Sequence, residues 1–113
     1  MAVTNAVKAQ TLTSIDAATF TGAYQAVNPN GLTAPCFMLV MTNRSSSNVI
    51  VSYDGSTDNE FLGAEMTLIL PFQTNSQPNN FNALMPEGTV IYVKGAAGVG
   101  NIYVSGYYQA QNN

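Results

Sequence analysis

The stretch NVIVSYDGSTDNEFLGAEMTLILPF, residues 48–72, decides the fold class of this chain. Its first part is rich in β-branched and aromatic residues, and Val49, Val51 and Tyr53 all point to one side if the backbone is extended. A period of two is typical of a strand with one buried face, whereas a helix repeats after about 3.6 residues. NVIVSY therefore predicts a β-strand.

The segment MTLILPF, at the other end of the stretch, alternates in the same way. One face carries Thr67 and Ile69. The other face carries the larger apolar residues, namely Met66, Leu68, Leu70 and Phe72. Pro71 has no backbone N–H to give to a sheet, which places this second strand at a sheet edge or near its own end.

Four further segments are typical of strands. They are Ala23–Val27 (AYQAV), Phe37–Thr42 (FMLVMT), Thr89–Lys94 (TVIYVK) and Asn101–Tyr108 (NIYVSGYY). We expect the last two to form a hairpin through GAAGVG, whose glycines allow tight connections. FMLVMT is continuously apolar, which predicts a strand covered on both faces or one at a subunit contact.

Turn sequences separate these segments at short intervals. They are NPNG at 28–31, NRSSSN at 43–48, DGSTDN at 54–59, NSQPNN at 75–80 and PEG at 86–88. Many short strands with such spacing predict an all-β protein, a single small antiparallel β-sandwich or jelly roll. Residues 1–21 predict an extended N-terminal arm, although Ser14 also suits the cap of a short helical turn.

The composition points to an assembly component. The 113 residues suit one domain, residues 1–113, and only 8% of them are charged, with a net charge of -3. Soluble domains usually carry about 25% charged residues. The polar surface must therefore come from Asn, Gln, Ser and Thr. Burying these side chains against another subunit costs less desolvation free energy than burying ions. We expect a homo-oligomer.

Charge and hydropathy also exclude some classes of partner. The only cations are Lys8, Arg44 and Lys94, which are too few and too scattered to neutralise several phosphates, so we expect no nucleic-acid binding. The longest apolar run, Cys36–Met41, is too short to cross a bilayer. The start MAVTNAVKAQ does not resemble a secretion signal, so we expect a soluble protein made in the cytoplasm.

The acidic row DGSTDNEFLGAE overlaps the ligand spacing of a calcium-binding EF-hand. Counted from Asp54, it places oxygen-bearing side chains at positions 1, 3, 5, 7 and 12, the last being Glu65. Position 6 is Asn59 instead of Gly, position 9 is Leu62, and both flanks alternate as strands where an EF-hand needs helices. We therefore interpret Asp54 and Gly55 as turn residues, expect no metal ligand, and keep an incidental calcium site between Asp54 and Glu65 as the alternative.

Nothing in the sequence predicts an enzyme. The chain has no His and no Trp, and GAAGVG lacks the Lys-Ser/Thr pair and the helix of a phosphate-binding loop. We expect no catalytic residue, no cofactor and no small-molecule substrate. Cys36 lies in the apolar run PCFMLVM, which predicts a buried small hydrophobic residue and not a reactive thiol.

Aromatic residues gather in the C-terminal part of the chain. They are Tyr92, Tyr103, Tyr107 and Tyr108. On strands we expect such residues first of all to pack in cross-strand pairs, with a platform for glycans or a partner protein as the alternative. Tyr107 and Tyr108 are adjacent, so one of them must face away from the other.

Two segments of the chain resemble small β-sandwich virion proteins of tailed bacteriophages. The first is MTNRSSSNVIVSYDGSTDNEFL, in which SYDG turns the chain after a strand, and the second is PEGTVIYVKGAAGVGNIYVSGYY. The resemblance covers roughly Met41 to Tyr108, and the matched positions are mainly turn glycines and strand residues.

This resemblance implies a structural, non-enzymatic component of a virion. It looks most like a capsid cement protein, also called a decoration or staple protein: a small jelly roll that binds the major capsid protein and stabilises the shell. The N-terminal arm, Ala2 to Thr21, and the polar loop Asn75 to Asn82 are the expected clamps. Two alternatives remain: a collar, tail or fibre-anchoring adaptor of the virion and, from another class, a carbohydrate-binding module that uses Tyr and Asn-rich loops.

Overall fold

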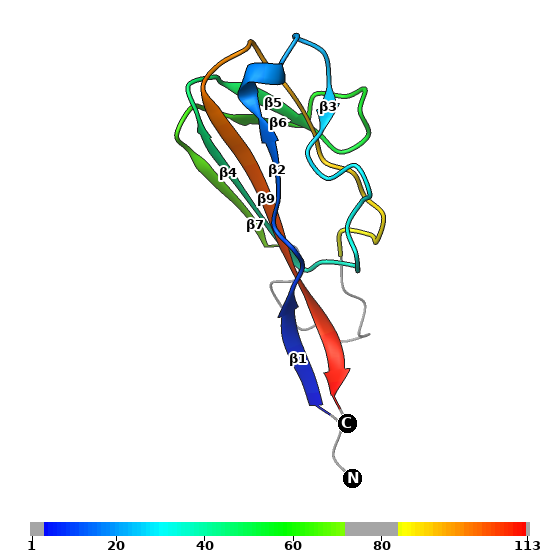
Figure 1. Ribbon diagram of the computed structural model, residues 1–113. Helices are drawn as coiled ribbons and strands as arrows, with labels where there is room; N and C mark the ends of the chain where they lie inside the picture. Colours follow the sequence, from blue (N-terminus) through cyan, green and yellow to red (C-terminus); the bar gives the residue numbers. More distant parts are fainter. Residues whose placement is uncertain (1–3, 72–83, 113) are drawn as a thin grey trace.

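Two antiparallel sheets form the protein (Figure 1). The computed structural model describes residues 4–71 and 84–112, so Phe72 and the proposed clamp Asn75–Asn82 lie outside the described residues. Sheet A has the order β1-β9-β4-β7, with β2 also paired to β9, and sheet B has the order β3-β8-β5-β6. The strands of sheet A are β1 (Thr4–Ala9), β2 (Thr13–Asp16), β4 (Met38–Ser45), β7 (Thr67–Pro71) and β9 (Gly100–Asn112). Those of sheet B are β3 (Gln25–Ala26), β5 (Val49–Ser52), β6 (Glu60–Leu62) and β8 (Tyr92–Lys94).

The strand order is that of a jelly roll. β1 and β2 both pair with β9, so they act as one interrupted edge strand. The pairs β5–β6, β4–β7, β3–β8 and β1/β2–β9 then enclose one another in the sequence and alternate between the two sheets. This nested winding is the two-sheet jelly roll, which confirms the predicted all-β sandwich.

The core lies between the two sheets. Strand β4 shows why: Leu39 and Met41 are fully buried, while Met38 and Val40 between them are half-buried on the other side. Within the described residues, the apolar segment FMLVMT is therefore fully buried on one face and only half-buried on the other. Full cover on both faces is not found, and the alternative, a subunit contact, stays a prediction. β5 and β9 contribute to the core by the same alternation, as Val51 and Val104 show.

The predicted C-terminal hairpin is wrong. β8 pairs with β3 and β5 in sheet B, whereas β9 pairs with β1, β2 and β4 in sheet A. GAAGVG therefore crosses from one sheet to the other. Gly100 at its end has φ +112, and a Cβ there would stand 2.1 Å from the carbonyl oxygen of Arg44, so only glycine fits.

The N-terminal segment is extended, as expected, and it pairs with β9. β1 and β2 are separated by a short break near Gln10, whose N–H donates to the carbonyl of Gly106. Beyond β2, residues Ala17–Thr19 form one 3₁₀ turn, η1. Its cap is Asp16, which accepts a hydrogen bond from the N–H of Ala18, and not Ser14. Strand and helical turn therefore both occur, one after the other.

Strand β9 is longer than the body of sheet A. It pairs with β4 from Gly100 to Tyr107, and its remaining residues pair with β1 alone in the described part of the chain. The two strands project from the sandwich as a ribbon, seen at the lower end of Figure 1. Both outer edges of this ribbon carry backbone N–H and C=O groups that no described strand uses.

Several uncharged polar residues are buried inside the sandwich. Asn43 donates to the carbonyls of Ser47 (2.7 Å) and Leu62 (3.1 Å) and accepts from Ser45, so it ties β4 to β6. Asn28 accepts from the N–H of Ile91 (2.6 Å) and donates to the carbonyl of Thr89. We expected Asn and Ser to supply the polar surface, but these side chains fasten loops to the core.

No helix of the described residues has the length and apolar character needed to cross a membrane.

Candidate functional site

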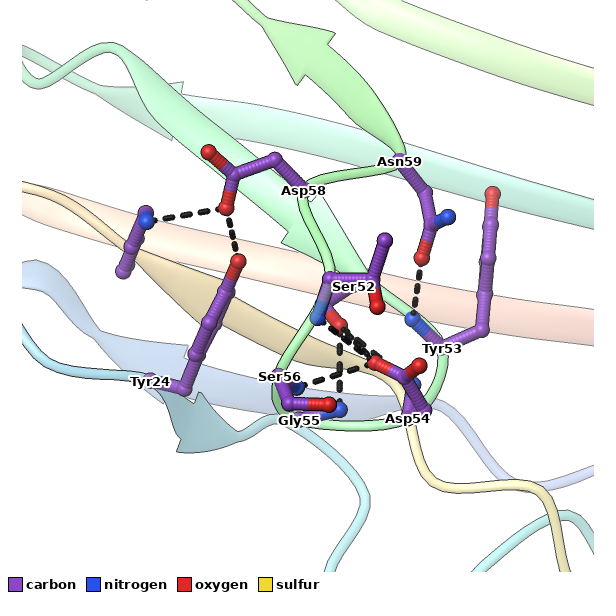
Figure 2. A network of polar contacts seen from close by, with 10 residues as sticks. Tyr24, Ser52, Tyr53, Asp54, Gly55, Ser56, Asp58 and Asn59 are labelled. Carbon is purple, nitrogen blue, oxygen red and sulfur yellow. Dashed lines mark hydrogen bonds and ion pairs between the residues drawn. The ribbon is translucent and has the colours of Figure 1, made fainter.

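The acidic turn between β5 and β6 is organised around the carboxylate of Asp54 (Figure 2). Its Oδ1 accepts hydrogen bonds from the N–H groups of Ser56 (2.9 Å) and Thr57 (2.8 Å), and from the hydroxyl of Ser52 (2.9 Å). The two backbone donors, followed by Ser52, hold the pKa of Asp54 well below its usual range. Gly55 has φ +81, as expected for an Asp-Gly turn.

Asp58, at the far end of the same turn, reaches across to sheet B. Its carboxylate lies 2.8 Å from the ammonium of Lys94 on β8 and accepts a hydrogen bond from the hydroxyl of Tyr24, just before β3. The ammonium also stands 4.6 Å from the centre of the Tyr24 ring. Lys94 first, and then Tyr24, lower the pKa of Asp58.

These contacts fold the turn over the outer face of sheet B. A Cβ on Gly55 would lie 3.2 Å from the ring of Tyr92, which shows how closely the backbone approaches β8. Asn59 closes the turn by accepting from the N–H of Tyr53 (2.9 Å). We call residues 53–59 the lid of sheet B.

The acids of the calcium-like spacing do not converge. Asp54 is bound by backbone donors, Asp58 by Lys94, and Glu60 by the Tyr53 hydroxyl at 3.4 Å. Glu65 pairs with Arg44 at 3.4 Å. No group of three or more metal-ligating side chains lies together among the residues that the structure describes. The turn interpretation of Asp54 and Gly55 is confirmed by its geometry.

The two apolar residues that follow the acidic turn lie on opposite faces of sheet B. Leu62 is buried in the core, whereas Phe61 is 60% exposed. β6 pairs Phe61 with Ile50 on the outer side of sheet B, so alternation sends the two neighbours to opposite faces.

The outer face of sheet A is of a different kind. The registers of β2, β4, β7 and β9 set its outward residues in rows across the strands. We call the following set the uncharged face: Ser14, Met38, Val40, Thr42, Thr67, Ile69, Pro71, Tyr103, Ser105 and Tyr107. All of them are half-buried or exposed.

Charges lie only at one end of this face. There Asp16 and Arg44 flank Asn101, and Arg44 pairs with Glu65. At the other end, Ala9 pairs with Tyr107 and Val7 with Gln109, so the ribbon continues the same uncharged side. The face and the ribbon side together offer a partner hydroxyls, aromatic rings and aliphatic side chains.

A pocket opens beside the break between β1 and β2. Its volume is about 240 Å³, and it is lined by Gln10, Thr11, Thr13, Asn28, Pro29, Asn30, Gly31 and Thr33. The side-chain oxygen of Gln10 accepts from the N–H of Thr33 (3.2 Å), which joins the two walls. No side chain in the lining is charged.

The tyrosines divide between core and surface. Tyr108 packs against the core, while Tyr107 belongs to the uncharged face, so the expectation that the two face opposite ways is confirmed. Tyr92 lies beneath the lid, and Tyr103 lies on the uncharged face. The four do not form one platform, because they are spread over both outer faces and the core.

Cys36 is fully buried, as the sequence predicted, and burial raises the pKa of its thiol. Sequence reasoning missed Tyr24 and Lys94, because they meet Asp58 only in the folded chain. It also missed the contrast between the two outer faces, which needed the sheet order. Comparison of the chain with protein-family models, with curated proteins and with solved structures finds no match in any of the three.

Proposed function

We propose that this protein is a non-enzymatic structural component of a bacteriophage virion, a capsid cement protein that binds the major capsid protein and stabilises the shell. The jelly roll supports the proposal because it is a sandwich that viral capsid proteins use. The resemblance of the segments between Met41 and Tyr108 to small phage virion proteins also supports it.

The observation that carries the proposal is the uncharged face of sheet A together with the ribbon. A surface of Tyr, Met, Val, Ser and Thr can be covered by a partner without the cost of desolvating ions. Interfaces are enriched in Tyr and Met for the same reason. The free edges of β1 and β9 add backbone groups that can pair with a strand of a neighbouring subunit.

The mechanism is stabilisation by linkage. A copy that bridges a seam between capsid subunits binds the assembled shell and not the separated subunits, so binding shifts the equilibrium toward the shell. Because the shell is symmetric, a modest contact is repeated at every equivalent seam. The lid of sheet B would face away from the capsid, since it already covers its own sheet.

The test is binding to capsids that lack the protein. Purified protein should co-sediment with such capsids and raise their melting temperature. Thr42→Lys places a charge in the middle of the uncharged face and should abolish both effects. Ser56→Lys places the same charge on the lid and should abolish neither.

Three results would contradict the proposal: no binding by the unmodified chain, equal binding by both variants, or absence of the protein from purified virions. Location at the collar, tail or fibre base in a particle reconstruction would instead support the adaptor role on the same virion.

A second candidate, a carbohydrate-binding module, is favoured by the pocket beside Gln10. Its lining combines amide and hydroxyl groups without charge, which suits neutral sugar hydroxyls, and jelly rolls also serve as lectins. Glycan-array binding by the isolated protein that is lost in Asn30→Ala would favour this function. Absence of any glycan binding would remove it.

A further inference from the structure

Strand β7 is an edge strand of sheet A whose backbone register can be assigned. It pairs with β4, with Leu39 opposite Leu70 and Met41 opposite Leu68. In line with this register, the N–H of Asn43 donates to the carbonyl of Met66 at 2.8 Å. Hydrogen-bonded pairs alternate along an antiparallel ladder, so Leu68 and Leu70 also give their N–H and C=O groups to β4.

The intervening residues of β7 point their backbone groups the other way. Thr67 and Ile69 each present an N–H and a C=O to the free edge, and Pro71 presents a C=O. Pro71 therefore costs sheet A no hydrogen bond, because its missing N–H belongs to the side that no described strand uses.

β7 is also an edge strand without protection by charge. Edge strands commonly carry charged residues that prevent pairing with another chain. β1 contains Lys8, β2 contains Asp16 and β6 contains Glu60, while β3 has only two residues. β7 reads TLILP, with no charge at any position.

Exposed apolar side chains lie on β7, on β6 and in the connection between them. Ile69 on β7 is 56% exposed, Phe61 on β6 is 60% exposed, and Met66 in the connection between them is 52% exposed. Phe61 and Met66 lie together at Gly63, where a Cβ would contact both side chains. Strand β7 therefore has an edge that no described strand pairs with, and exposed apolar side chains lie on it and in the connection that precedes it.

We propose that this edge binds a second copy of the chain, β7 against β7 in antiparallel orientation, with Ile69 at the twofold axis. The two Ile69 residues would exchange N–H···O=C hydrogen bonds. On either side, the N–H of Thr67 would donate to the carbonyl of Pro71 in the other copy. Pro71 needs to act only as an acceptor in this register, so the strand is complementary to itself.

Charge favours a second copy as the occupant. In a twofold contact each residue near the axis meets its own kind, so an acid there would face the same acid of the other copy and oppose association. The chain has a net charge of -3, and β7 carries no acid, whereas the edge beside it on sheet B carries Glu60. The paired sheets A would then form one continuous sheet across the dimer. This inference holds whether or not the protein belongs to a virion.

Sedimentation equilibrium of the purified protein tests the dimer. The expected mass is twice 12.0 kDa at high concentration, with dissociation on dilution. Ile69→Pro removes the two central hydrogen bonds but no bond to β4, so it should give a folded monomer. Ile69→Lys, which leaves the N–H in place, is the second variant and should also give a monomer through charge repulsion. Ser105→Lys, on the same face but on β9, should leave the dimer intact.

Amide hydrogen exchange adds a readout at single residues. The N–H groups of Thr67 and Ile69 should be protected in concentrated protein and lose protection on dilution, while Leu68 and Leu70 stay protected throughout. A monomer at all concentrations would overturn the inference. So would a dimer that survives both Ile69 variants, or one that Ser105→Lys disrupts, since either result places the contact elsewhere.

Discussion

The two outer faces of the sandwich differ in what covers them. The lid, residues 53–59, covers the part of sheet B around Tyr92, and Asp58 pairs there with Lys94 at 2.8 Å. Sheet A presents the uncharged face, on which no described loop lies and no ion pair forms except at the end near Arg44. The chain therefore covers part of one outer face with its own lid and leaves the other face available to a partner.

The difference follows from where the few charges lie in the fold. A face that must remain in water benefits from ions, whereas a face that exchanges water for protein is hindered by them. The chain places Asp54, Asp58 and Lys94 on the side of sheet B. The predictions below test this contrast, starting from the core that both sheets share.

The largest effect should separate the two sides of strand β4. Leu39→Ala removes a fully buried side chain and should lower the free energy of unfolding by about 2–5 kcal/mol. Val40→Ala, on the uncharged face of the same strand, should cost less than about 1.5 kcal/mol. Urea titration of both variants measures the difference. Equal losses would show that Val40 is covered within a single copy of the protein.

The next effect concerns the closure of sheet B. Gly55→Ala adds a Cβ at φ +81 and 3.2 Å from the Tyr92 ring, so it should cost about 2 kcal/mol. Gly22→Ala is the matched control, because Gly22 has φ +89 with nothing within 4 Å, and should cost about 1 kcal/mol. Thermal unfolding of the two variants gives the comparison. If the free energy of unfolding falls by the same amount in both variants, the lid does not pack closely against Tyr92 on β8.

A smaller effect should come from the carboxylate that holds the lid. Asp54→Ala removes the acceptor of the Ser56 and Thr57 N–H groups and should speed their amide exchange. Asp54→Asn keeps an oxygen acceptor and should preserve most of the protection. If both variants exchange at the rate of the unmodified chain, the turn is held by other contacts.

The same carboxylate gives the lid a dependence on pH. The pKa of Asp54 is lower in the folded protein than its unfolded value of 3.8, and that of Asp58 is lowered as well. The stabilisation that these two carboxylates give to the folded protein is therefore fully present above about pH 4. It is lost as the pH falls through their lowered pKa values in the folded protein. Amide exchange of Ser56 and Thr57 should rise relative to Thr42 in that acidic range. A parallel response of all three would contradict the prediction.

The smallest effect should occur on the uncharged face itself. Thr42→Val replaces a half-buried hydroxyl on the outward side of β4 and should change the free energy of unfolding by less than about 0.5 kcal/mol. Chemical denaturation measures it. A larger loss would show that the hydroxyl is needed by the isolated chain, and the contrast between the two faces would then be weaker.

Much of the local structure could be predicted from the sequence. Alternation identified β5 and β7 and separated Leu68 and Leu70 from Ile69, and in the structure the first two pack against the core while Ile69 is exposed. The Asp54-Gly55 pair identified the turn, because an Asp carboxylate accepts from the N–H groups that follow it and Gly tolerates positive φ. These features depend on neighbouring residues, which a sequence displays directly.

The pairing of distant strands could not be predicted in the same way. β8 and β9 were assigned to one hairpin because they are close in sequence, but a strand with one buried face fits either sheet equally well. The contacts around Asp58 could not be predicted for the same reason. Tyr24 and Lys94, which contact it, lie 34 and 36 residues away in the sequence. The burial of Asn28 and Asn43 could not be predicted either, because composition does not reveal which amide side chains find buried partners.

The nested winding of the strands sets an order in which the chain can fold. Val51 and Glu60, paired in the innermost hairpin, are separated by 9 positions, whereas Thr4 and Asn112, paired in the ribbon, are separated by 108. The entropic cost of closing a loop grows with its length, so we expect β5–β6 to form first and each outer pair to close over the one before it. The ribbon and the outer edge of sheet A then form last, and until they do, β4 keeps an open edge that neighbouring chains can reach. In a cell that produces this protein in quantity, chains with an exposed β4 edge are therefore present before the native fold is complete.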